Sequence, residues 1–329
     1  MSSILTPLIA VFIIMLLGSI VQKLRFLPAD TDLILNQFVY YIAFPAILLI
    51  VLAETRIEDI IQWGFIGGFS LAMIITYALV IAVSLWRKPK QQAVAAMRAL
   101  NATFGNTAFI GIPLLSLLFP GNKIALVAAA IASLLSVFMF AFALVSIELA
   151  SRDKKSTDHA IVIMANALCK NPIVLGSVIG ISLSALHITL PESLALVLHQ
   201  IGNTSSPCAL FAIGMVLAKA LRHQSFAKMF SLGLIIELSF INLLKLFVQP
   251  LIAFGLLKFF GVEHQLLIMG VLLAALPTAA SVYLLAERYQ INANGSAQGI
   301  LYGTLITFIS LPIIETLYTV YQYSGLVVY

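Results

Sequence analysis

Charged side chains are scarce in this chain. Asp, Glu, Lys and Arg together make up 9% of its 329 residues, whereas 61% of the residues are hydrophobic. A soluble domain carries roughly 25% charged residues, and no polar stretch of the sequence is long enough to form one. The composition therefore predicts an integral membrane protein embedded in a lipid bilayer, and it excludes a soluble enzyme with a single membrane anchor.

Patterns that carry metal, redox or nucleotide chemistry are also missing. The two cysteines, Cys169 and Cys208, form no disulfide or metal-binding pattern, and the five histidines have no spacing suited to a metal. The sequence contains no G-x-S-x-G, no H-E-x-x-H and no nucleotide-binding glycine loop. We therefore expect no enzyme, no metal, no cofactor and no ATP-driven pump.

Long apolar runs are abundant instead. A helix needs about 20 apolar residues to cross ~30 Å of hydrocarbon, and ten segments meet this length, at about 4–22, 32–53, 62–85, 93–118, 123–149, 171–188, 192–218, 231–257, 264–286 and 296–321. The first lacks the basic leader and cleavage site of a signal peptide, so we expect a membrane helix. Between the fifth and sixth spans, helical spacing predicts a short interfacial helix that contains Ile161, Ile163, Met164, Ala167 and Leu168.

The basic residues lie unevenly about these ten spans. Fourteen of the 18 Lys and Arg residues lie on the side of the first and other odd-numbered loops, and three lie on the other side. Lys and Arg are retained in the cytoplasm, so we expect both termini outside a bacterial inner membrane. The net charge of +5 is thus explained by topology, and no nucleic-acid partner is expected.

Glycine and proline landmarks recur at nearly one offset. Gly18 and Gly180 are 162 residues apart, as are Pro45 and Pro207, and Pro113 and Pro277 are 164 apart. The predicted fold is an all-α polytopic membrane protein whose ten transmembrane helices form two inverted five-helix repeats, residues 1–160 and 161–329. Such repeats with paired discontinuous helices are typical of secondary transporters.

The fourth and ninth spans are predicted to be broken at mid-depth. The fourth contains NATFGNTAFIGIP, from Asn101 to Pro113, and the ninth contains Pro277. Proline disrupts the helix bond to an earlier carbonyl, and such a break is tolerated only where it faces protein or a watery cavity. We expect each proline to begin a second half-helix whose free N–H groups bind an anion. The alternative is a simple kink with hydroxyls on the freed carbonyls. Candidate substrate-binding residues are Asn101, Thr103, Asn106, Thr107, Ile112, Pro113, Pro277, Thr278 and Ser281.

These stretches resemble a known family. GNTAFIGIPLL, AALPTAASVYLLAERY and SAQGILYGTLITFISLP are similar to sequences of the auxin efflux carriers, which include plant auxin carriers and bacterial transporters of small carboxylates. The resemblance covers nearly the whole chain and implies a plan like that of the bile-acid/sodium symporters. It implies a scaffold of spans 1, 2, 6 and 7, a transport domain of spans 3–5 and 8–10, and elevator-like movement of a carboxylate. It also places the family's substrate-binding Asn at Asn106 and suggests a homodimer through spans 2 and 7.

The chain also departs from the plant pattern. Only about twenty residues separate spans 5 and 6, and the fifth span is apolar around Ala141. Its nearest polar candidates are Ser133 and Ser136, so auxin itself is not assumed to be the substrate.

Two ionisable residues stand out within the spans. Glu237 and Lys245 lie eight residues apart, about 12 Å along a helix, so we expect no direct bond between them. Lys245 is a candidate counter-charge for an anion and Glu237 a candidate proton site; alternatively, Lys245 bonds to backbone carbonyls and Glu237 reaches the cytoplasmic surface. Glu148, near a span end, is expected to be solvated. A sodium site built from Thr107, Ser133 and Ser136 is conceivable but has no carboxylate.

The predicted function is secondary transport of a small organic anion, most simply a carboxylate, through a site at mid-membrane. Two alternatives stay open. One is a membrane-embedded receptor or regulator that binds the anion without moving it. The other is a sodium-coupled symporter of an amphipathic acid.

Overall fold

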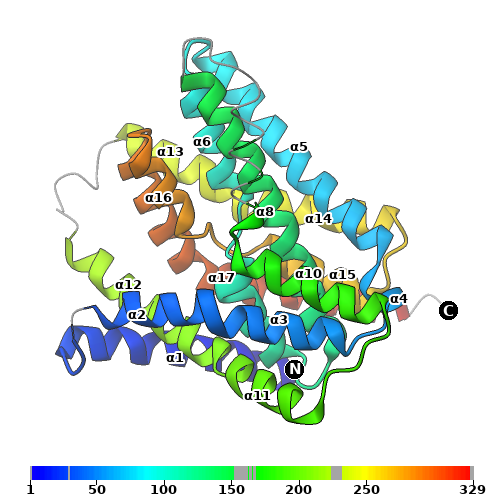
Figure 1. Ribbon diagram of the computed structural model, residues 1–329. Helices are drawn as coiled ribbons and strands as arrows, with labels where there is room; N and C mark the ends of the chain where they lie inside the picture. The colour runs from blue at the N-terminus through cyan, green and yellow to red at the C-terminus, as the bar shows by residue number, and fades with distance from the viewer. Residues whose placement is uncertain are drawn as a thin grey trace.

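The structure is a computed structural model that describes residues 2–28, 30–151, 162, 165, 168–223 and 232–326. It is helical, and Gly105 and Thr278 form an isolated antiparallel bridge (Figure 1). Most of the predicted interfacial helix, including Ile161, Ile163, Met164 and Ala167, lies outside the described residues.

Among the described residues, six helices are long and apolar enough to cross a membrane, and four shorter helices are also apolar. The long ones span Thr31–Ala53, Ile57–Arg87, Lys123–Ala150, Glu192–Lys219, Ile235–Phe259 and Gly295–Ile314; the shorter ones span Ile9–Leu24, Thr107–Leu118, Pro172–Ala185 and His264–Ala274. Each coincides with one of the ten predicted segments. The prediction of an all-helical membrane protein is confirmed.

One group of helices comes from the start of each half of the chain. It consists of α1 (Ser2–Leu24), α2 (Thr31–Phe38), η1 (Val39–Ala43), α3 (Phe44–Ala53), α10 (Pro172–Ala185), α11 (Glu192–Asn203) and α12 (Ser205–His223). Within it, α1 packs on α12, and α10 and α11 pack on α3 (Figure 1). Glycines permit close contact: a Cβ at Gly18 would lie 2.1 Å from the carbonyl oxygen of Phe211, and one at Gly180 would lie 2.6 Å from that of Leu49. These helices are therefore in direct backbone contact.

The other group contains the broken helices. It consists of α5 (Trp63–Arg87), α6 (Gln92–Thr103), η2 (Thr107–Gly111), α7 (Ile112–Leu118), α8 (Lys123–Ser151), α13 (Leu232–Leu243), η4 (Leu244–Val248), α14 (Gln249–Phe259), α15 (His264–Ala274), α16 (Ser281–Arg288) and α17 (Ala293–Leu326). The short α4 (Ile57–Ile60) precedes α5. α5 packs on α6 and α14, and α6 packs on α8. Phe65, Met97 and Leu100 are among the fully buried side chains of this group.

Among the described residues, three helices contain a π-helical turn, and a proline follows each turn. η1 precedes Pro45, η2 precedes Pro113 and η4 precedes Pro250, each proline standing in the first turn of the next α-helix. Proline cannot donate a backbone hydrogen bond, and a widened turn lets the chain enter and leave the helix around that missing donor. Two of the three π turns, η2 and η4, lie near the centre of the second group.

Both predicted breaks are present. The fourth predicted span stops at Thr103 and resumes at Thr107, and the ninth stops at Ala274 and resumes at Ser281. The expectation that each proline begins the second half-helix is met only in part, because Pro113 stands in the first turn of α7 but the half-helix starts earlier, at η2. The π turn η2 starts well before Pro113 because Asn106 caps it, and Pro277 stands in the non-helical connection before α16.

Candidate functional site

The two breaks lie side by side and are joined by their backbones. The Asn106 N–H donates to the Pro277 carbonyl at 2.8 Å, and the Ala279 N–H donates to the Phe104 carbonyl at 3.2 Å. These bonds flank the bridge between Gly105 and Thr278. Backbone groups freed from a helix inside a membrane must find partners within the protein, and here each break supplies partners to the other.

The two joined breaks, residues 104–106 and 277–279, are called the crossing below. Side chains around the crossing bond to the helix that enters it and to the helix that leaves it. The Thr278 hydroxyl donates to the Asn101 carbonyl at 2.6 Å, near the end of α6. The Asn106 Oδ1 accepts the Phe109 N–H at 3.2 Å, which makes Asn106 the N-cap of η2. This cap uses the side-chain oxygen of Asn106 and leaves its amide nitrogen to act as a donor.

A cavity of about 1440 Å³ opens beside the crossing. Its wall includes Asn106, Thr107, Thr278 and Ser281 from the crossing, and Asn36 and Gln37 from α2. It reaches the start of α2, the start of α10 and the later part of α12, so it opens on the side of the odd-numbered loops. Among the described residues, its lining contains no Asp, Glu, Lys or Arg.

Two helix starts face this cavity. Ala108, Ala280 and Ser281 lie in its wall at the beginnings of η2 and α16, where the N–H groups cannot be bonded within their own helix. The described residues supply no other partner for these three N–H groups. Helix N-termini carry partial positive charge and bind anions. The crossing thus presents two sets of anion donors to one cavity.

The helix α8 forms a polar wall next to these donors. Ser136 accepts a hydrogen bond from the Thr107 hydroxyl at 3.4 Å. Ser133 lies one turn away, is 2% exposed and lines the cavity, yet its hydroxyl has no partner among the described residues. The buried Oε1 of Gln298 on α17, also in the cavity wall, is likewise unpartnered within the described part of the chain.

Lys245 lies behind the crossing. It is 1% exposed, and its ammonium donates to the Ala274 carbonyl at 2.6 Å and to the Gln249 side-chain oxygen at 2.7 Å. The Gln249 amide in turn donates to the Thr103 carbonyl at 3.2 Å. Thr103 and Ala274 are the last residues of α6 and α15, so this pair of side chains satisfies the negative ends of both half-helices.

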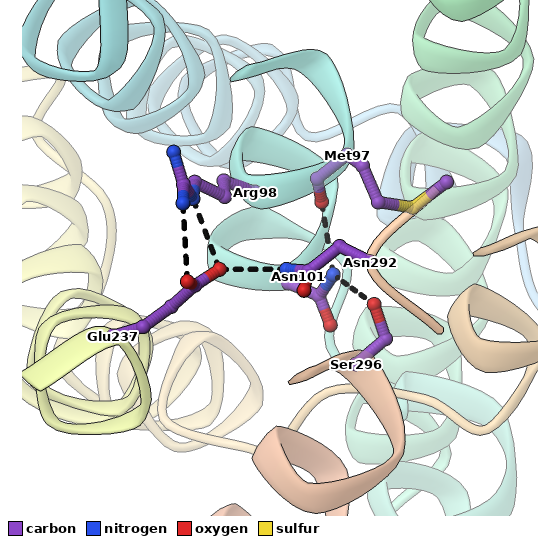
Figure 2. Close-up of polar contacts among 6 residues, drawn as sticks. All are labelled: Met97, Arg98, Asn101, Glu237, Asn292 and Ser296. Carbon is purple, nitrogen blue, oxygen red and sulfur yellow. Dashed lines mark hydrogen bonds and ion pairs between the residues drawn. The ribbon is translucent and has the colours of Figure 1, made fainter. Parts of the chain in front are cut away.

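Glu237 is part of a separate polar cluster near the start of α17 (Figure 2). Arg98 donates to both of its carboxylate oxygens at 3.0 Å, and Asn292 donates to one of them at 2.6 Å. Asn101 donates to the Met97 carbonyl and to the Ser296 hydroxyl, each at 2.9 Å. The cluster ties α6 to α13 and α17.

The predicted site residues therefore separate into four groups. Asn106, Thr107, Ser133, Ser136, Thr278 and Ser281 line the cavity. Asn101, Thr103, Ile112, Pro113 and Pro277 lie outside its lining and support the crossing or the core. Lys245 lies directly behind the crossing and bonds to a backbone carbonyl, as one of the two alternatives expected. Glu237 is held by Arg98, which neither alternative foresaw.

Sequence reasoning missed Gln249, Arg98 and Gln298. The separation of Lys245 and Gln249 by one helical turn was a usable signal for the first. Glu148 is a correction: it is 7% exposed and accepts a hydrogen bond from the Tyr289 hydroxyl at 2.7 Å, so it is not solvated. Tyr289 begins the turn between α16 and α17, and hydropathy does not reveal which way the chain leaves that turn.

Another ionic cluster lies at the end of α3, whereas the cavity reaches the start of α2. Glu54, at the end of α3, accepts from Lys123 of α8 at 3.1 Å and pairs with His199 of α11 at 2.9 Å. Partial burial acts to raise the pKa of Glu54, but the hydrogen bonds and charges of His199 and Lys123 outweigh it and hold that pKa below its ordinary value. The cluster joins the two groups of helices.

Comparison with known proteins agrees with this architecture. The profile of a family described as "Membrane transport protein" matches residues 3–315. A protein of Rhizobium meliloti (strain 1021) named "Putative malonate transporter" is 26% identical over 297 residues, which is 90% of each chain. The match extends across both breaks and all the cavity-lining helices. The chain therefore belongs to the membrane transport protein family, that of the auxin efflux carriers.

Proposed function

We propose that this protein is a secondary transporter that carries a small carboxylate through the cavity at the crossing. The observation that carries the proposal is the meeting of two helix starts, with free N–H groups at Ala108, Ala280 and Ser281, in the wall of a single cavity. Such donors hold a carboxylate without a buried arginine. The name of the Rhizobium relative makes malonate the first acid to test.

Movement of the carboxylate would follow an elevator plan. The helices α1–α3 and α10–α12 serve as the scaffold, and α5–α8 with α13–α17 serve as the moving body that contains the site. The glycine contacts support two inverted repeats: the contact of Gly18 with Phe211 and that of Gly180 with Leu49 are related by the same shift of 162 residues. A repeat predicts such equivalent contacts because each half builds the same helix pair.

Orientation and assembly remain part of the proposal. With both termini outside, the cavity opens toward the cytoplasm of a bacterial cell, so the described conformation faces inward. A homodimer would form through α2–α3 and α11–α12, whose surfaces expose Ile34, Ile42, Leu196 and Val197. Lipid would cover the same residues in a monomer.

The first test is current from purified protein in proteoliposomes on a solid support. The acids are malonate, malate, succinate, an indole carboxylate and a bile acid, each with and without sodium. We expect a saturable, sodium-independent current for a small carboxylate. Sodium-dependent current with the bile acid would favour the symporter. Binding without current or tracer flux would favour the receptor.

The Asn106→Ala variant tests whether the substrate binds at the crossing. Removal of one hydrogen bond to a charged ligand costs about 1.5–3 kcal/mol, so we expect the Kd for the acid to rise roughly 10- to 100-fold. Asn36→Ala is the matched control, because Asn36 lines the same cavity from α2, away from the crossing. Equal effects of the two substitutions on Kd would contradict the placement.

A further inference from the structure

The charge around the cavity points to the ionic form of the substrate. The described cavity wall is uncharged, but Lys245 lies directly behind it. A Cβ at Gly105, which lines the cavity, would lie 3.1 Å from the Lys245 ammonium. The backbone of Gly105, part of the cavity wall, therefore lies directly against that ammonium.

The charge of Lys245 is not balanced by a carboxylate within the described residues. The turn η4 packs on α6, α13, α14 and α17. Arg98 of α6 and Glu237 of α13 neutralise each other, and Lys258 stands at the far end of α14. Residues 293–314 of α17 contain no charged side chain, and α15, whose end meets Lys245, has its His264 at the opposite end.

The helix ends add little to the net charge around the site. The C-termini of α6 and α15 each contribute about half a negative charge, and the starts of η2 and α16 each contribute about half a positive one. These four contributions cancel to a first approximation. With Lys245 protonated, the site as a whole therefore carries about one positive charge, supplied by its ammonium.

The unpartnered groups on the wall indicate what the rest of the ligand offers. The Gln298 Oε1 is an acceptor, and the Ser133 hydroxyl can donate or accept. A second carboxylate could only accept, so it would leave the Gln298 Oε1 unsatisfied. A protonated carboxyl group donates one hydrogen bond and accepts another, which suits an acceptor and a hydroxyl on the same wall.

We propose that the site selects a singly charged substrate, and that a dicarboxylate such as malonate binds as its half-protonated monoanion. The inference rests on the proposed function and adds the charge state of the transported acid. A dianion would leave one uncompensated negative charge in a low-dielectric site, at a cost that a monoanion avoids. The proton of the acid then travels with the substrate, and no protein carboxylate has to carry it.

The test compares three acids of similar size in tracer-uptake and competition measurements with the native protein in proteoliposomes. The malonate dianion gains one proton and becomes the monoanion between about pH 7.5 and about pH 5.5, because the charge on one carboxylate raises the pKa of the other. Malonamate has one carboxyl and stays a monoanion throughout this range. Difluoromalonate stays a dianion, because fluorine withdraws electrons from both carboxyl groups. The membrane potential is clamped and the pH is equal on both sides.

We expect the KM for total malonate to fall as the pH falls and to stay constant when expressed as monoanion concentration. Malonamate should compete with a pH-independent affinity, and difluoromalonate should compete at least about tenfold more weakly. Gln298→Leu should raise the KM for malonate and leave that for propionate, which has no second carboxyl, unchanged.

The opposite order of affinities would overturn the inference. If difluoromalonate competes as well as malonamate, or if the KM is constant in dianion concentration, the site takes dianions and only the proposed function survives. If none of the three acids nor any acid of the current panel binds, the proposed function fails, and this inference fails with it.

Discussion

Arg98 and Lys245 belong to two neighbouring helices, α6 and the helix formed by α13, η4 and α14, but their charges are balanced in different ways. Arg98 meets the Glu237 carboxylate with two hydrogen bonds and is 18% exposed. Lys245 is 1% exposed and meets only a carbonyl and an amide oxygen within the described residues. The opposite charges of the Arg98–Glu237 pair largely cancel each other at a distance, whereas the positive charge of Lys245 is not cancelled and its field extends into the cavity. Only the second cation is thus available to a substrate.

The largest expected effect comes from Lys245→Met. Removing the charge should weaken carboxylate binding at least about tenfold, or about 1.4 kcal/mol, and abolish detectable uptake. The protein should still fold, because loss of a buried charge also removes its desolvation cost. Uptake measures the loss of transport, and the thermal unfolding midpoint measures whether the variant still folds. The control is Lys170→Met, which removes the charge of an exposed lysine. Retained high-affinity binding in the Lys245 variant would remove this lysine from the site.

At the Arg98–Glu237 pair, substitutions should lower the stability of the protein and leave substrate binding nearly unchanged. Glu237→Gln leaves Arg98 partly buried without its carboxylate, so we expect a loss of about 1–3 kcal/mol in stability, less than the cost at a fully buried pair. Arg98→Met combined with Glu237→Leu should recover most of that loss because no charge is left unpaired. Malonate KM should change little in either variant that folds. A large change in the pH dependence of uptake would instead return Glu237 to a role as proton site.

The smallest effect is expected at Glu54, which is one-third exposed. Its pKa is lower in the folded protein, so the pairs with Lys123 and His199 contribute stability above the ordinary carboxyl pKa, and this contribution is lost as the pH falls through the lowered value. At the surface it amounts to about 0.5 kcal/mol. Glu54→Gln should therefore lower the unfolding midpoint slightly at neutral pH and should have no such effect once the pH is below the lowered pKa of Glu54. An equal difference at both pH values would contradict the assignment.

The sequence predicted the helices, the two breaks and six of the residues in the cavity wall, since these follow from hydropathy and from polar residues at helical spacing or next to proline. It could not predict how Lys245 is partnered. That contact depends on where α15 ends, and the helix stops at Ala274 because the extended segment around Pro277 pairs with the other break. The pairing of Arg98 with Glu237 joins residues far apart in the chain, and no local pattern reports such a contact. The π turns were also invisible, so the start of η2 was placed too late.

The backbone bonds between the two breaks bear on the kinetics of a carrier. Because the Asn106 N–H and the Pro277 carbonyl are joined, as are the Ala279 N–H and the Phe104 carbonyl, both sets of anion donors belong to one rigid unit. Such a unit would keep the same donors around the substrate on either side of the membrane. Loading and release would then differ only in which aqueous phase has access, and the direction of net flux would be set by the gradients across the bilayer.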